Sequence, residues 1–251
     1  MFVAASTDCF SQLPLGEALE RLVDLEYTSV EIALREDGRQ LKPSEVLADP
    51  EGVLHACRKT HRLTPCAYYV DMSPEDPRYY QAFAACCKLA RATKVVCITV
   101  PSAELGTPFN AEIERLRELV KIAHEEQVLV GMKTQSGCLT EDPTTAQVLC
   151  DNVKGLGITL DPSHYLFGPK AGANYDNLLK YVYHLQLRDT NKKALQVRVG
   201  QGEVEYGKLA TQLAKFKYDR ALCVQMFDTA NADVDHFAEM RKIRLLLESL
   251  L

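Results

Sequence analysis

Eight short apolar runs recur along the 251-residue chain, and their starts lie between 27 and 37 residues apart. Each run is four to six residues long and rich in Val, Ile, Leu, Cys and Tyr, a composition typical of parallel strands buried on both faces. The expected strands are Phe2–Ala5, Ser29–Ala33, Pro65–Tyr69, Val95–Val100, Val128–Lys133, Gly157–Leu160, His184–Arg188 and Ala221–Met226. Because a strand and its crossover helix need about thirty residues, this spacing predicts eight strand–helix units.

Longer amphipathic stretches separate the apolar runs. In one of them Ile113, Leu116 and Val120 recur at the three- and four-residue spacing of a helix face. The expected helices are Pro14–Leu25, Pro43–Thr60, Pro77–Ala92, Phe109–Glu126, Thr144–Asn152, Asn174–Tyr181, Tyr206–Phe216 and Asp233–Leu250. Eight such units close a (β/α)8 TIM barrel, and we expect one domain over residues 1–251. A doubly wound open sheet usually has a glycine-rich turn after its first strand, and Ser6-Thr7-Asp8-Cys9 has no glycine.

Composition excludes several classes of protein and of partner. The formal net charge is −5 and no run is rich in Lys or Arg, so we expect neither nucleic acid nor an anionic membrane as a partner. The nine cysteines are odd in number and form no CxxC motif, which favours buried reduced thiols over a disulfide framework. We find no basic and apolar leader and no apolar run long enough to span a membrane. We therefore expect a cytoplasmic protein.

Active residues of such barrels lie at the carboxyl ends of the strands. Asp161 follows the sixth expected strand, and His164 comes three residues later in Asp-Pro-Ser-His. A carboxylate and an imidazole at that spacing can hold a metal or flank a polar substrate. The alternative is a plain turn in which Asp161 caps the loop and His164 packs.

Further polar residues fall on or just after neighbouring strands. Alternation places His184, Gln186 and Arg188 on one side of the seventh strand, where burial is costly unless each is hydrogen-bonded or faces a ligand. We favour a core role for His184 and ligand contact for Gln186. Lys133 ends the fifth strand and either points into the barrel mouth or snorkels outward. Arg198 precedes a Gly-Gln-Gly loop and either clamps a substrate or is solvated.

Four segments resemble the xylose isomerase-like barrel family, the sugar phosphate isomerases and epimerases. The segments are Tyr27-Thr28-Ser29-Val30-Glu31-Ile32, Gly157-Ile158-Thr159-Leu160-Asp161-Pro162-Ser163-His164, Leu185-Gln186-Leu187-Arg188-Asp189-Thr190, and Gly200-Gln201-Gly202-Glu203-Val204-Glu205-Tyr206 with the later run Ala221-Leu222-Cys223-Val224-Gln225. The resemblance covers nearly the whole chain. It implies a small carbohydrate as substrate, an isomerase or epimerase activity, and a homodimer or homotetramer.

The same resemblance implies a divalent metal such as Mn, Mg, Co or Zn. In the family it is held by a Glu ending the fifth strand, the sixth-strand Asp, a seventh-strand His and a Glu ending the eighth strand, and the two Glu residues also move the proton. This sequence keeps Asp161, and His164 matches a substrate-contacting His. Lys133, Gln186 and Gln225 replace the other three ligands. The four family ligands carry a charge of about −3, whereas the four residues here sum to about zero. We therefore expect no metal cofactor.

These substitutions lead to a working hypothesis and its alternatives. We expect Lys133 to take the place of the cation and to pair with Asp161. Any catalysis is expected from Lys133, Asp161 and His164. Substrate binding is expected from Glu31, Gln186, Arg198 and Gln225. Alternatively, Lys133 forms a Schiff base as in lyases and aldolases, although a nearby Asp161 opposes the lowered pKa this needs. A third hypothesis is that the barrel binds a sugar or a partner protein without catalysis.

Overall fold

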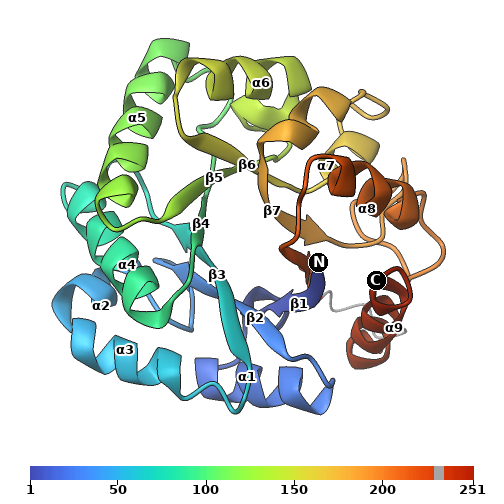
Figure 1. Cartoon of the computed structure of the whole chain (residues 1–251), viewed down its shortest axis with the longest axis horizontal. Coiled ribbons are helices and arrows are strands. Elements are labelled where there is room, and N and C mark those ends of the chain that lie inside the picture. The colour runs from blue at the N-terminus through green and yellow to red at the C-terminus, as the bar shows by residue number, and fades with distance from the viewer. Residues whose placement is uncertain (229–234) are drawn as a thin grey trace.

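Eight parallel strands close into a barrel in the computed structural model, which describes residues 1–228 and 235–251. The strands pair in chain order, and β8 closes on β1 (Figure 1). They are β1 (Phe2–Ser6), β2 (Ser29–Arg35), β3 (Thr64–Asp71), β4 (Cys97–Val100), β5 (Leu129–Lys133), β6 (Leu156–Leu160), β7 (Val182–Leu187) and β8 (Ala221–Val224). The predicted (β/α)8 barrel is confirmed, and the strand ends differ from the sequence-based ranges by two residues at most.

The helices form a ring outside the barrel (Figure 1). The α-helices are α1 (Leu15–Asp24), α2 (Pro43–Ala48), α3 (Pro50–Arg58), α4 (Tyr79–Thr93), α5 (Phe109–Glu125), α6 (Pro143–Asn152), α7 (Ser163–Leu166), α8 (Tyr206–Lys215) and α9 (His236–Glu248). Shorter 3-10 turns are η1 (Thr7–Phe10), η2 (Leu139–Glu141) and η3 (Asp176–Tyr181). The first two residues of the last predicted helix, 233 and 234, lie outside the described residues. Within the described ranges, no helix is both long and apolar enough to cross a membrane.

Apolar helix faces and strand side chains make one continuous core between the ring and the barrel. On α5, Ile113, Leu116 and Leu119 are buried, as the helical spacing predicts. Burying each side chain of this size stabilises the fold by about 1.5–3 kcal/mol before entropy is counted. All nine cysteines are free thiols; eight are buried and Cys66 is half-buried. Burial of the thiols agrees with their interpretation as small apolar residues.

The helix expected over Pro43–Thr60 is two helices, because a proline interrupts it. The residue before a proline disfavours helical dihedrals, and Asp49 has φ −137° and ψ 73°. Its side chain instead accepts a hydrogen bond from Gly52 N at 3.0 Å and caps α3. Pro50 then occupies the first turn of α3, where no amide hydrogen is required.

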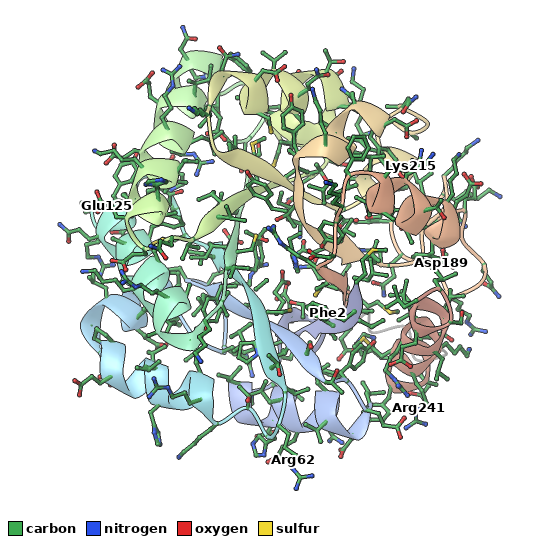
Figure 2. All side chains as sticks on the ribbon, in the orientation of Figure 1. Phe2, Arg62, Glu125, Asp189, Lys215 and Arg241 are labelled. Carbon is green, nitrogen blue, oxygen red and sulfur yellow. The ribbon has the colours of Figure 1, made fainter. Side chains whose placement is uncertain are left out.

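The interior of the barrel is unusually polar. Glu31, His184, Gln186 and Arg188 are each at most 2 % exposed, and Lys133 is only 5 % exposed. Figure 2 shows side chains filling the centre of the barrel. Such interiors are normally packed with branched apolar residues, and polar groups are costly there unless they are hydrogen-bonded or meet a ligand. The contacts of these polar side chains therefore define the candidate site.

Candidate functional site at the carboxyl ends of the strands

The Asp-Pro-Ser-His segment after β6 holds the Asp161 carboxylate in one position. The short helix α7 begins at Ser163, whose backbone amide donates to Asp161 Oδ1 at 3.1 Å, and the Ser163 hydroxyl donates to the same oxygen. The hydroxyl of Thr134 accepts from Asp161 N at 2.8 Å. Asp161 Oδ1 is thus used for capping, and Oδ2 is left for a partner in the barrel.

That partner is Arg188, which corrects the expected pair between Lys133 and Asp161. Arg188 NH2 donates to Asp161 Oδ2 at 2.7 Å and to Gln225 Oε1 at 2.8 Å. Lys133 Nζ instead donates to Gln225 Oε1 at 3.0 Å and lies 4.9 Å from the centre of the Tyr69 ring. The guanidinium reaches Asp161 from the adjacent strand, whereas the ammonium extends across the barrel. Lys133 does point inward, as expected.

Lys133, Asp161, Arg188 and Gln225 form what we call the cationic cluster. Burial and its two cations set the charge states of its members. Burial lowers the pKa of Lys133, and the neighbouring positive charge of Arg188 lowers it further. Burial by itself would raise the pKa of Asp161, but the positive charges of Arg188 and Lys133, the neighbouring His164 and the Ser163 hydrogen bond together outweigh it, so the pKa lies below its usual value. Asp161 is therefore ionised, and Lys133 loses its proton more easily than an exposed lysine.

His164 is a neutral imidazole beside Asp161. Burial lowers its pKa to about 4, although the Asp161 charge acts in the opposite direction. Its Nδ1 accepts from the Ser136 backbone amide at 3.2 Å, which leaves the ring proton on Nε2, 3.6 Å from Asp161 Oδ2. That distance is too long for a hydrogen bond, so the Nε2 proton remains available to a ligand.

Glu31 and Gln186 lie deeper in the barrel than was expected of substrate-binding residues. The Gln186 amide donates to both Glu31 oxygens, at 3.0 and 3.1 Å, and both side chains are fully buried. Gln186 Oε1 is buried with no hydrogen-bond partner. Gln225 is better placed for a ligand, since it contacts Lys133 and Arg188 directly.

The structure does not bring Arg198 into this cluster. It is exposed in the segment between β7 and α8, where the neighbouring Val199 N donates to Glu239 Oε2 at 2.6 Å and so anchors the segment to α9. The substrate-clamping role of Arg198 stays a prediction.

The Gly-Gln-Gly loop is built around the Asp189 carboxylate. Oδ2 of Asp189 accepts from Gly200 N at 2.7 Å and from Gly202 N at 3.0 Å, and Oδ1 accepts from Thr190 N at 3.1 Å. Gly200 has φ +90°, a conformation that favours glycine. Asp189 and the two glycines therefore shape the loop after β7 and carry no evidence of nucleotide binding.

Replacing Gly202 by alanine is expected to lower the free energy of unfolding by about 2 kcal/mol. A Cβ there would stand 1.9 Å from Asp189 Oδ1 and 2.7 Å from the backbone nitrogen of Thr190, so the loop would have to shift. Urea unfolding measures the change. The control is Gly16→Ala on α1, where a Cβ meets nothing within 4 Å. A Gly202 variant as stable as the control would contradict this account of the loop.

Several residues of the site were undervalued by sequence reasoning. Arg188 was placed inward by strand alternation, but its pairing with Asp161 was missed. The Phe227 ring lies 4.2 Å from the Arg188 guanidinium carbon, a cation–π contact that covers the arginine. Asp8 accepts from Gln225 Nε2 at 3.3 Å and pairs with Arg35 at 3.4 Å. The available signal for Asp8 was its place directly after the first strand.

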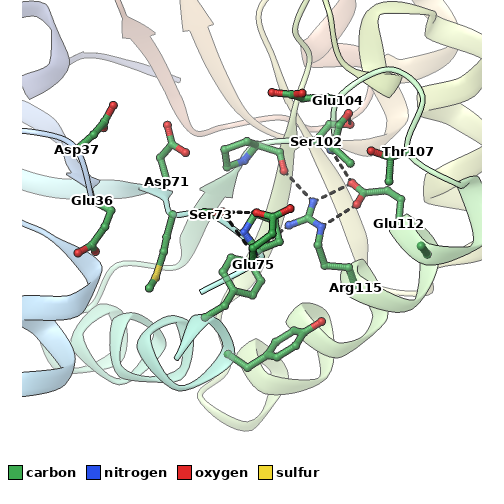
Figure 3. Close-up of a pocket in the computed structure, with 17 residues that line it drawn as sticks. Glu36, Asp37, Asp71, Ser73, Glu75, Ser102, Glu104, Thr107, Glu112 and Arg115 are labelled. Carbon is green, nitrogen blue, oxygen red and sulfur yellow. Dashed lines mark hydrogen bonds and ion pairs between the residues drawn. The ribbon is translucent and has the colours of Figure 1, made fainter. Parts of the chain in front are cut away.

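An acidic cavity of about 860 Å³ lies by the loops that follow β2, β3 and β4, and its described lining contains none of Lys133, Asp161, Arg188 and Gln225. Figure 3 shows Glu36, Asp37 and Asp71 on one side and Glu112 and Arg115 on the other. Six carboxylates line it, namely Glu36, Asp37, Asp71, Glu75, Glu104 and Glu112. Tyr69, whose ring faces Lys133, donates from its hydroxyl to Asp71 at 3.2 Å and so links the cluster to the cavity. The lining disfavours anions, because its only cation, Arg115, already pairs with Glu112.

The cationic cluster does not fit the divalent metal that the sequence resemblance implies. Of the four corresponding positions, Lys133 supplies an ammonium, and Gln186 and Gln225 supply amides that are poor ligands beside carboxylates. The remaining carboxylate, Asp161, is already paired with Arg188 at 2.7 Å. A dication here would meet two buried positive charges.

Comparison with known proteins places the chain in a family. The model of the xylose isomerase-like TIM barrel family matches residues 19–246. The chain belongs to this family. Similar solved structures include a 3-keto-D-glucoside 4-epimerase from E. coli (14 % identity, TM-score 0.74, covering 99 % of both chains) and a D-psicose 3-epimerase (11 %, 0.75, covering 99 % of this chain and 97 % of that one). A zinc-bound IOLI protein is also similar (17 %, 0.74, covering 100 % and 99 %). No curated protein matches the sequence.

Proposed function

We propose that the protein binds a small sugar, polyol or sugar phosphate at the mouth of the barrel and moves a proton on it, in an isomerase- or epimerase-like reaction that uses no divalent metal there. One observation carries the proposal. Gln225 Oε1 accepts from both Lys133 Nζ, at 3.0 Å, and Arg188 Nη2, at 2.8 Å. Lys133 replaces one of the family's metal ligands, and Arg188 pairs with Asp161, the ligand that is kept, so two buried cations stand where the family holds its metal. The proposed setting is cytoplasmic, as a homodimer or homotetramer.

The cluster contains the groups that proton transfer next to a carbonyl requires. Lys133 and Arg188 would stabilise the negative oxygen that forms when the proton leaves. Asp161, which is ionised, would take the proton from the carbon and return it to the substrate, and the neutral His164 would donate a hydrogen bond from Nε2 to the substrate. Gln225 would bind a hydroxyl group. An anionic substituent would lie toward the two buried cations, Lys133 and Arg188.

Calorimetry with ketohexoses and their phosphates, in the presence of EDTA, tests the proposal. We expect a ligand to bind without added metal and Lys133→Met to weaken it by about 10–100-fold, since a hydrogen bond to a charged group is worth about 1.5–3 kcal/mol. Lys121→Met, at a lysine 67 % exposed on α5, is the control and should bind normally. Binding that appears only after Mn²⁺ or Zn²⁺ is added, or equal binding by both variants, would overturn the proposal. Binding without turnover would instead identify a non-catalytic sugar-binding protein.

A second candidate function, a Schiff-base lyase or aldolase, is favoured by the surroundings of Lys133. Its pKa is lowered by burial and by Arg188, although the Asp161 carboxylate, which pairs with Arg188, still acts in the opposite direction. A lysine deprotonated near neutral pH can attack a ketone. Borohydride added with a keto-sugar would then fix the sugar onto Lys133, detectable by peptide mass. Absence of any mass gain at Lys133 with the sugars that bind would exclude this function.

A further inference from the structure

Three metal-binding side chains meet in the barrel below the cationic cluster. The ligand atoms of Glu31, His184 and Cys223 all lie within 4.8 Å of one another, and the three residues are at most 2 % exposed. Within the described ranges, this is the one group of His, Cys, Asp and Glu side chains with such mutual distances. None of the three is a residue that we place at the mouth in the proposed reaction.

Strand geometry places this group one level deeper than the mouth. His184 precedes Gln186 by two residues on β7, and Cys223 precedes Gln225 by two residues at β8. Residues two apart on a strand point to the same side, so both side chains face the interior below the amides. The register pairs Gln186 with Cys223, which brings the two strands together at this level. Glu31 completes the group from β2.

Nε2 of His184 touches a carboxylate but makes no hydrogen bond. It lies 2.8 Å from Glu31 Oε2 in an ion-pair contact, yet the geometry does not qualify as a hydrogen bond. A ring nitrogen without a hydrogen bond, in a residue only 2 % exposed, is unfavourable unless another group binds it. A metal ion beside the carboxylate and the thiol would bind that nitrogen through its lone pair.

We propose that Glu31, His184 and Cys223 hold a divalent zinc-class ion. A thiolate, a carboxylate and a neutral imidazole are ligands that zinc takes in proteins, and bonds of about 2.0–2.3 Å put tetrahedral ligands about 3.5 Å apart. The three ligand atoms lie within 4.8 Å of one another, and the 2.8 Å between His184 Nε2 and Glu31 Oε2 would have to widen when an ion enters. The thiolate and carboxylate supply two negative charges, which match a dication.

The ion would have a structural role, and the proposal does not depend on the proposed function. Buried ligands give an ion no open path, so it would enter while the chain folds. The site is distinct from the mouth, where Lys133 and Arg188 still take the place of the family's metal. The zinc content of the protein and its sugar binding in EDTA are separate measurements, so either proposal can fail without the other.

Metal analysis of the purified protein tests the site. After refolding in zinc and gel filtration without chelator, we expect about one zinc ion per chain, and at least about tenfold less in Cys223→Ala and in His184→Gln. The control is Cys87→Ala, which removes another fully buried thiol, on α4, and should keep the zinc. Zinc-free wild-type protein, or full zinc content in Cys223→Ala, would overturn the proposal.

A measurement on the wild type alone covers the case in which those variants do not fold. Protein refolded with cobalt should show the ultraviolet absorption of a thiolate–cobalt bond. Zinc-edge X-ray absorption should find sulfur at about 2.3 Å from the ion together with nitrogen and oxygen at about 2.0 Å. A bound ion with no sulfur ligand would refute the assignment to Cys223.

Discussion

Replacing Arg188 by methionine is expected to lower the free energy of unfolding by about 3–5 kcal/mol, the cost of leaving one partner of a buried ion pair alone. Arg188 and Asp161 are both fully buried, and their 2.7 Å contact is the one hydrogen-bonded ion pair described for that carboxylate. Methionine has a similar length but no charge, so most of the loss comes from the stranded Asp161. The cation–π contact with Phe227 is lost as well.

Urea unfolding at pH 7.5 measures the loss, and two further variants interpret it. Adding Asp161→Asn to Arg188→Met should recover a large part of the stability, because the stranded charge is then removed. Arg117→Met breaks an exposed pair with Glu114 and should cost less than about 1 kcal/mol. A similarly small loss in Arg188→Met would mean that Asp161 is protonated or solvated, contrary to its buried ion pair.

The fold followed from the sequence because two signals agreed along the whole chain. Doubly buried strands need uninterrupted apolar runs, and crossover helices need one apolar face, so strand β5 and helix α5 were each visible in isolation. The break within one expected helix was missed. Asp49-Pro50 divides it into α2 and α3, although a proline at that point indicates a helix boundary.

Only part of the site could be predicted, because the spacing of residues along the sequence does not show which side chains contact one another in the fold. Strand ends and alternation identified Lys133, Asp161, Gln186 and Gln225 as barrel residues. They did not show which cation would reach Asp161, which depends on the barrel's register, including the irregularity between β6 and β7 at Ile158 and Thr159. The sequence also does not show how deep in the barrel a side chain lies. Glu31 was expected to bind substrate, and it is fully buried against Gln186.

His164 is expected to make the protein less stable as the pH falls below 6.5. Its pKa in the folded protein is about 4, against 6.5 for an unperturbed histidine, because burial disfavours the charged ring. Between these two pH values the unfolded chain binds a proton that the folded protein does not, so stability falls as the pH is lowered. The whole effect is about 3 kcal/mol, of which about 2 kcal/mol should be lost between pH 7.5 and pH 5.

Comparison with His164→Gln isolates this effect from other titrating groups. Glutamine can still accept from the Ser136 amide but does not titrate, so its stability should exceed the wild type's increasingly as the pH falls from 7.5 to 5. The difference should approach its limit near pH 4. His55→Gln serves as the control, since that ring lies on α3, far along the chain from the cluster, and should follow the wild type. Parallel curves for His164→Gln and wild type would show that the imidazole titrates normally when folded, and His164 would then be cationic in mild acid, with an Nδ1 that can no longer accept from the Ser136 amide.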